Sequence, residues 1–182
     1  FCESLHSQLE KGHSLSPRQL EILTEKEKQY GPEATREENS WFDSWDEEKA
    51  EIFRVCAHYY RPTGYFTQLS LKALEDDFIP TRRNFNKMCN NKYAMKVRNA
   101  WFAEPKYPQG TCVSLRSSAP RYAGGGILPK HKDGKSIAYF VLRSNSSPPI
   151  SASAGAKMYL VVSTGSPHTI EIEERHIKKL RR

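Results

Sequence analysis

Long apolar stretches are missing from this sequence of 182 residues. No run approaches the roughly 20 apolar residues that a membrane-spanning helix needs. The first residues, Phe1-Cys2-Glu3, carry neither the basic nor the apolar segment of a secretory signal peptide. We therefore expect an intracellular protein, cytoplasmic or nuclear, that is not secreted and has no membrane partner. Because the chain starts without Met and its helical periodicity already begins at Phe1, a fragment of a longer protein is an open alternative.

Clustered metal ligands are also missing. The four cysteines form no CxxC pair, and the histidines never recur at a spacing of three or four residues. Local zinc sites need such pairs, and disulfide-rich folds need densely spaced cysteines. The sequence therefore predicts free, mostly buried thiols, no metal and no cofactor.

Motifs for catalysis are absent as well. The sequence contains no GxSxG, no HExxH and no paired-carboxylate signature. An enzyme needs a convergent set of reactive groups, and no spacing in this chain indicates one. We therefore expect a protein that is not an enzyme.

Charge is distributed unevenly along the chain. Residues 1–80 carry 9 Lys and Arg against 16 Asp and Glu, a net charge of −7, whereas residues 81–182 carry 19 against 5, a net charge of +14. Such asymmetry is typical of a chain whose basic part meets a polyanion and whose acidic part meets something else. A solvated helical surface would show the same pattern.

The first 105 residues have the apolar spacing of helices. Ser16-Pro17-Arg18-Gln19 combines an N-cap serine, a proline at the first helical position and a glutamine three residues after the serine. This is a capping box for a helix that extends to about Lys28. Other helices are expected near residues 1–9, 33–45, 46–60, 65–74 and 81–104, the last of them broken or divided around Asn90-Asn91. The sequence therefore predicts a helical domain over residues 1–105.

The last of these helices is strongly basic. Residues 81–103 contain no acid, and apolar residues that include Tyr93 follow helical spacing on the opposite side from the cations. Such a face suits contact with a phosphate backbone. It suits equally well a solvated surface packed beside the acidic helices, and the charge pattern does not separate the two. The candidate phosphate-binding residues here are Arg82, Arg83, Lys87, Lys92, Lys96 and Arg98.

Beyond Pro105 the periodicity changes from helical to extended. Short runs with strand character occupy residues 111–116, 137–143, 157–162 and 169–173, with a possible fifth at 177–180. Loops rich in Gly, Ser and Pro separate them. Short strands of this kind predict a small, partly open β-barrel over residues 106–182. The fold class expected for the whole chain is α+β.

The stretch RYAGGGILPKHKDGK, residues 121–135, raises the question of a nucleotide site. A phosphate-binding P-loop leads from a strand into a helix, whereas Gly134-Lys135-Ser136 leads into an expected strand. We therefore interpret the segment as a long loop between the first two strands. A flexible basic loop can contact a nucleic-acid backbone without reading its sequence, and a solvated linker is the alternative. The candidate cations are Arg121, Lys130, Lys132 and Lys135.

The C-terminal tail adds further cations and completes the candidate set. Lys178, Lys179, Arg181 and Arg182 would extend a basic patch begun by the loop. Two aromatic residues, Tyr107 and Tyr122, are candidates for base stacking. A role in the core or in anchoring a loop is the alternative for each of them.

The segments PQGTCVSLR, AYFVLRS, GAKMYLVVS and TIEIEERHIKKL together resemble SH3-like barrels of the KOW and Tudor kind. The similarity lies in a Gly before the first strand, a Gly-Ala-Lys-Met-Tyr strand opening and a closing acidic-then-basic segment. The chain departs from KOW modules in its long glycine loop and from Tudor modules in lacking an aromatic cage. The resemblance implies a barrel but not methyl-lysine binding.

The first 23 residues, FCESLHSQLEKGHSLSPRQLEIL, resemble a short helix-turn-helix segment of virus and phage replication-associated proteins. This resemblance implies a role in DNA metabolism and carries no catalytic residue. Together with the basic half, it predicts a nucleic-acid-binding accessory protein, for DNA in preference to RNA and largely insensitive to sequence. The alternative is a protein-interaction or structural module, virion- or ribosome-associated, whose acidic, aromatic-rich helices bind a protein partner.

Overall fold

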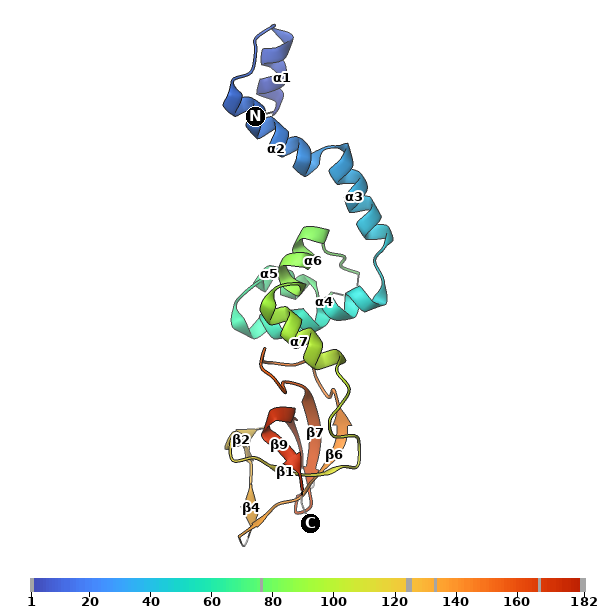
Figure 1. The fold of residues 1–182 in the computed structure, drawn as a ribbon, viewed down its shortest axis with the longest axis vertical. Coiled ribbons are helices and arrows are strands. Elements are labelled where there is room, and N and C mark those ends of the chain that lie inside the picture. The colour runs from blue at the N-terminus through green and yellow to red at the C-terminus, as the bar shows by residue number, and fades with distance from the viewer. Residues whose placement is uncertain (1, 76, 124–125, 133, 167, 181–182) are drawn as a thin grey trace. The chain divides into compact units, whose positions relative to one another are not determined.

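The computed structural model describes residues 2–75, 77–123, 126–132, 134–166 and 168–180 (Figure 1). Helices precede an antiparallel sheet, so the mixed helix and sheet composition predicted from the sequence is confirmed. The chain divides into two compact units, Phe1–Trp45 and Asp46–Arg182. The change from helix to strand near residue 105 therefore lies inside the second unit. No helix among the described residues has both the length and the apolar content needed to cross a bilayer.

The first unit contains three helices and very little core. They are α1 (Cys2–Glu10), α2 (Pro17–Tyr30) and α3 (Pro32–Asp43). The predicted capping box is confirmed, because Ser16 Oγ accepts a hydrogen bond from the Gln19 amide at 3.3 Å while the Ser16 amide donates to Gln19 Oε1 at 2.8 Å. Neither α2 nor α3 contains a buried residue, whereas Leu5 of α1 is buried. Packing therefore contributes little to these helices.

The helices of the second unit form a packed group around one central helix. They are α4 (Glu47–Tyr60), the 3₁₀ turn η1 (Arg61–Thr63), α5 (Thr67–Lys72), α6 (Arg82–Cys89) and α7 (Lys92–Phe102). Helices α5, α6 and α7 each contact α4, which buries Phe53 and Cys56 against them. The predicted interruption at Asn90-Asn91 is confirmed, since these two residues separate α6 from α7.

Five strands make the antiparallel sheet of the second unit, in the order β8-β7-β6-β1-β9. They are β1 (Cys112–Leu115), β6 (Tyr139–Ser144), β7 (Met158–Ser163), β8 (Thr169–Glu173) and β9 (Ile177–Lys179), with the 3₁₀ turn η2 (Glu174–His176) before the last one. All five expected strands are present. Their core includes Val113, Tyr139, Tyr159 and Ile177.

The segment between β1 and β6 is more ordered than the sequence suggested. It contains two small antiparallel hairpins, β2 (Tyr122–Ala123) with β3 (Gly126–Ile127), and β4 (His131–Lys132) with β5 (Lys135–Ser136). Strands of two residues leave no periodic signal, which is why a loop was expected there. Gly124 and Gly125 of the glycine run lie outside the described residues.

A buried polar cluster connects α7 to the sheet. The ammonium of Lys157 donates to the carbonyl oxygen of Trp101 at 2.8 Å and to Asn145 Oδ1 at 2.6 Å. The amide of Asn145 donates to the same Trp101 oxygen at 3.0 Å. This oxygen belongs to the last turn of α7, where carbonyl groups have no partner within the helix. The cluster therefore caps α7 and fastens it to the strands.

Candidate nucleic-acid interface

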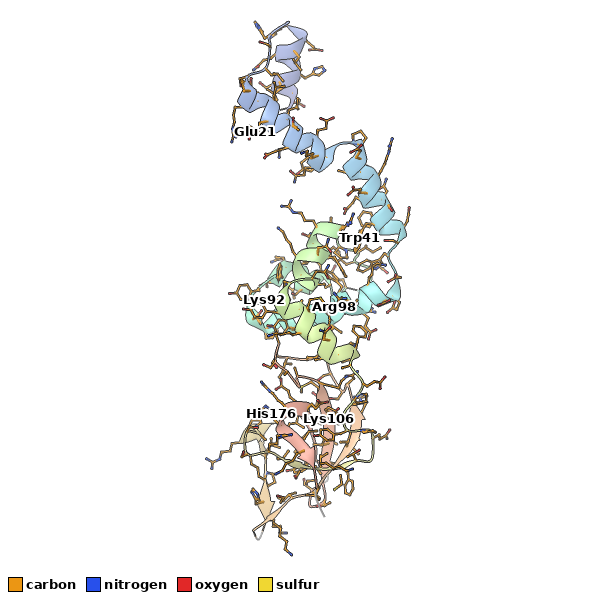
Figure 2. All side chains as sticks on the ribbon, in the orientation of Figure 1. Glu21, Trp41, Lys92, Arg98, Lys106 and His176 are labelled. Carbon is orange, nitrogen blue, oxygen red and sulfur yellow. The ribbon has the colours of Figure 1, made fainter. Side chains whose placement is uncertain are left out.

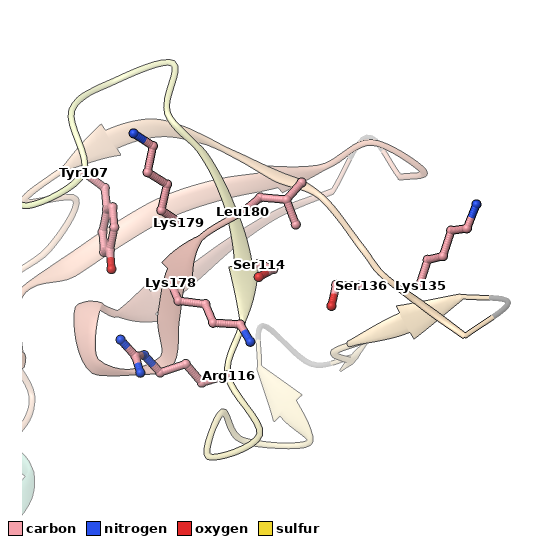
Figure 3. A pocket seen from close by; sticks show the side chains of 8 residues that line it. All are labelled: Tyr107, Ser114, Arg116, Lys135, Ser136, Lys178, Lys179 and Leu180. Atoms are coloured by element: carbon pink, nitrogen blue, oxygen red, sulfur yellow. The ribbon is translucent and has the colours of Figure 1, made fainter. Parts of the chain in front are cut away.

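A basic groove lies between one end of the sheet and the β4–β5 hairpin, with a volume of about 1270 Å³ (Figure 3). Tyr107 and Leu180 supply apolar lining. Among the described residues that line it, none is acidic. The polar and charged side chains of the lining are Ser114, Arg116, Lys135, Ser136, Lys178 and Lys179.

Strand register explains how Arg116, directly after β1, comes together with a cation of β9. Successive side chains of a strand point to opposite faces, and β1 buries Val113 and Leu115 in the core. Ser114 and Arg116 therefore belong to the other face. Lys178 stands directly opposite Ser114 in the β1–β9 pairing and so shares that face.

The guanidinium of Arg116 is held in place at this end of the sheet. Its Nε donates to the carbonyl oxygen of Ile177 at 2.8 Å, while the Arg116 amide donates to the His176 carbonyl at 2.8 Å. An arginine fixed through Nε keeps its two terminal nitrogens, which have the geometry for a phosphate or carboxylate. The Arg116 side chain thus reaches the groove with its Nε fixed to the backbone of the residue before Lys178.

The hairpin supplies the opposite side of the groove. Lys135 and Ser136 stand on β5, across the groove from Arg116 and Lys178 (Figure 3). Lys132 pairs with Lys135 across the hairpin, and both side chains are exposed. Gly134 at the turn has φ +74°, a conformation that glycine adopts without strain.

Lys130 plays a structural part instead of contributing a free cation. Its ammonium donates to the carbonyl oxygens of Ser117 at 2.8 Å and Ala119 at 2.6 Å. These bonds tie the chain after β1 to the chain before β4. Of the loop cations expected from the sequence, Lys135 lines the groove, Lys132 stands beside it, Arg121 is exposed outside the lining, and Lys130 anchors the backbone.

The basic face predicted on α6 and α7 is present but not uniform. Arg82, Arg83, Lys87, Lys92 and Lys96 are exposed. Arg98 is half-buried and donates through Nη1 to Asn90 Oδ1 at 2.9 Å and to the Cys89 carbonyl at 3.3 Å. Arg98 therefore stabilises the junction of the two helices, and the other five cations form the surface.

The remaining candidates fall into three groups: one lies in the core, two line the groove, and the others lie outside the described part of the chain. The ring of Tyr107 is only 5% exposed and packs against Tyr159 in the core, which leaves no open face for a base. The structure thus favours the core alternative for Tyr107. Lys178 and Lys179 line the groove, whereas Arg181, Arg182 and the side chain of Tyr122 lie outside the described part.

His176 lies next to the groove, in the turn before β9. Its imidazole Nε2 is 3.5 Å from Glu173 Oε2. Burial lowers the pKa of His176, and the positive charges of Arg175 and Lys130 lower it further, against the opposing effect of Glu173. The imidazole is therefore held in its neutral form at pH values where a solvated histidine begins to take up a proton.

Sequence reasoning missed Arg116, Ser114 and the true position of Tyr93. Arg116 was counted only as the end of a strand, although alternation with buried Val113 and Leu115 was a signal for an outward position. Tyr93 was assigned to the apolar side of its helix but is 49% exposed. Helical spacing alone does not distinguish the edge of an apolar stripe from its centre.

Among the described residues, no group of three or more His, Cys, Asp or Glu side chains is arranged to hold a metal ion. In comparisons with protein-family models, with curated protein sequences and with solved structures, none matches this chain. The site therefore rests on its own geometry, which gathers several cations around a hollow, with no acid among the lining residues that the structure describes.

Proposed function

We propose that this protein is a non-catalytic, nucleic-acid-binding accessory protein that contacts the phosphate backbone, of DNA in preference to RNA, with little regard to sequence. The observation that carries the proposal is the basic groove, where cations that follow β1 or stand on β5 and β9 surround one hollow. Lysine and arginine that neutralise phosphates release condensed counterions, and this release drives sequence-independent binding.

The composition of the groove supports backbone contact over base reading. Three of its four cations are lysines, and all three are exposed on short strands. Flexible ammonium groups follow a phosphate chain without selecting bases. Ser136 adds an exposed hydroxyl group, which commonly donates to phosphate oxygens. Arg116 adds a guanidinium whose orientation is fixed by the Ile177 carbonyl.

We further propose that the sheet is a partly open barrel of the SH3-like kind. In support, the last strand of the sheet, β9, pairs with its first strand, β1. The beginning and the end of the β-rich segment therefore lie side by side in one sheet. A groove beside the first and last strands is a natural position for a ligand on such a module, because long loops border it.

Charge reversal in the groove tests the proposed function. The double variant Lys178→Glu, Lys179→Glu removes two phosphate contacts, so the slope of log K against log salt should become shallower by roughly 1.4–1.8. Affinity should fall by a similar factor for oligonucleotides of unrelated sequence. Fluorescence anisotropy with labelled DNA and RNA, titrated from low to physiological salt, provides the measurement.

The matched control is Lys26→Glu, Lys28→Glu, which makes the same charge change at exposed positions of α2. The control should bind like the unaltered protein, and thermal unfolding of both variants should stay nearly unchanged. Equal binding by the groove variant and the unaltered protein would refute the proposal. Absence of any nucleic-acid binding at low salt would favour the protein-interaction or structural alternative.

A further inference from the structure

One aromatic side chain stands in the middle of the basic surface of α7. Tyr93 is 49% exposed, and the ammonium of Lys92 lies 5.0 Å from the centre of its ring. Lys96 follows one turn later, at the spacing that makes two side chains neighbours on a helix. Figure 2 marks Lys92 at the start of α7 and Arg98 further along the same helix.

The backbone that carries Tyr93 is rigidly held by Asn91. Asn91 Oδ1 accepts hydrogen bonds from the amides of Tyr93 at 3.0 Å and Ala94 at 3.1 Å, and from the Tyr60 hydroxyl at 2.8 Å. Its Nδ2 donates to the carbonyl oxygens of Lys87 at 2.9 Å and Met88 at 3.1 Å. The side chain thus caps α7 and fastens it to both α6 and α4, so the ring starts from a fixed position.

The chain segment that contains Tyr93 carries charges of one sign. Residues 81–103 contain six cations and no acid. Tyr30 provides a comparison, because it is also exposed, at 68%, and has Lys26 at 5.4 Å from its ring centre. Tyr30 lies on α2, where three cations and three acids balance, so its surroundings lack the net positive charge that attracts a polyanion. The two tyrosines share a local geometry and differ in the field around them.

An exposed ring among cations has the chemistry of a stacking platform for single-stranded nucleic acid. Every base has a π-face, so stacking on an aromatic ring tolerates any sequence, while cations beside the ring contact the backbone. A base paired within a duplex offers no free face for such a ring. The surface therefore fits unpaired bases better than a duplex.

We propose that the exposed face of α6 and α7 binds single-stranded nucleic acid, with the Tyr93 ring stacked on an unpaired base and Lys92 and Lys96 on the flanking phosphates. This proposal rests on the proposed function and adds a second contact, separate from the basic groove. It names unpaired bases as the feature that the protein recognises.

The test compares Tyr93→Leu with Tyr93→Phe on three labelled ligands: oligothymidylate, an abasic oligonucleotide of the same length, and a duplex. Leucine removes the ring but keeps an apolar side chain, whereas phenylalanine keeps the ring. Tyr93→Leu should weaken oligothymidylate binding by about 5- to 150-fold. Tyr93→Phe should bind like the unaltered protein, and the abasic and duplex ligands should bind both variants within about twofold.

Tyr30→Leu is the matched control, since it removes an exposed tyrosine that also has a lysine at its ring. It should leave oligothymidylate binding unchanged. This inference would be overturned if Tyr93→Leu weakened binding to the abasic ligand as much as to oligothymidylate. It would also be overturned if Tyr93→Leu did not weaken oligothymidylate binding while Lys178→Glu, Lys179→Glu still did. Either result would leave the proposed function standing. If the unaltered protein binds polyglutamate but none of the three ligands, both proposals fail.

Discussion

Two histidines of the second unit, His58 and His176, have a pKa that differs from the ordinary value of histidine. His58 and His176 both have a lowered pKa because burial disfavours the imidazolium. Arg61 lowers the pKa of His58 further, and Arg175 and Lys130 do so for His176. Protonating the partly buried His176 therefore costs more free energy in the folded protein than in the unfolded chain.

This shift predicts how stability depends on pH. The unfolded chain takes up a proton at His176 near pH 6.5, whereas the folded chain does so only at lower pH. In that interval the unfolded state binds more protons, so the free energy of unfolding falls as pH falls from about 7 towards 5. Urea unfolding at a series of pH values should show this decline, and His176→Gln should make it smaller.

The control for this experiment is Gln109→Ala, because Gln109 is exposed and has no titratable group. That variant should keep the full pH dependence of the unaltered protein. A His176→Gln protein with the same decline as the unaltered one would show that this imidazole does not contribute to it.

At the scale of elements, the contact between α7 and the sheet depends on one buried lysine. Lys157 is only 3% exposed, and burial lowers the pKa of its ammonium while Glu174 and Glu104 raise it. Two of its hydrogen bonds satisfy oxygen atoms of Trp101 and Asn145. Without the lysine, the Trp101 oxygen would keep the Asn145 amide as a donor, whereas Asn145 Oδ1 would lose its bond to Lys157. An acceptor that is shielded from water and loses its donor retains the cost of desolvation.

Lys157→Met tests this link, since methionine fills similar space without a donor. The free energy of unfolding should fall by about 1–3 kcal/mol. Urea denaturation followed by circular dichroism provides the measurement, and Lys106→Met serves as the control at an exposed lysine. A change below about 0.5 kcal/mol, typical of surface substitutions, would contradict the role given to Lys157.

At the scale of the whole molecule, stability is distributed unevenly between the two units. Helices α2 and α3 bury no residue, whereas α4 buries six, α6 three and α7 two. Helices of about 12–15 residues are marginal in water when packing does not support them. The first unit should therefore open locally far more often than the second.

Hydrogen exchange followed by mass spectrometry measures this difference directly. Peptides from residues 17–43 should exchange well before peptides from α4, α7 and the strands. If nucleic acid binds as proposed, protection should rise in β9, the β4–β5 hairpin and α7, with no change in α2. Equal protection in both units of the free protein would contradict the unequal packing described for them.

Local signals in the sequence predicted much of the fold. The Ser16 capping box, the interruption at Asn90-Asn91 and the five strands of the sheet all depend on neighbouring residues, and each is present. The β2–β3 and β4–β5 hairpins were not predicted, because strands of two residues carry no period. The candidate site was predicted in part, since the tail and loop lysines could be named but Arg116 and Tyr93 could not.

The sequence by itself determined the charge polarity of the chain, its helix caps and the alternation of its strands, because these depend on composition and on residues a few positions apart. Only the tertiary structure decided which cations share a surface. The pairing of β9 with β1 brings Lys178 beside Ser114, and the β4–β5 hairpin brings Lys135 to the same groove. Tertiary contacts also removed Lys130 and Arg98 from the free cations, since their hydrogen-bond partners lie far along the chain or across a turn.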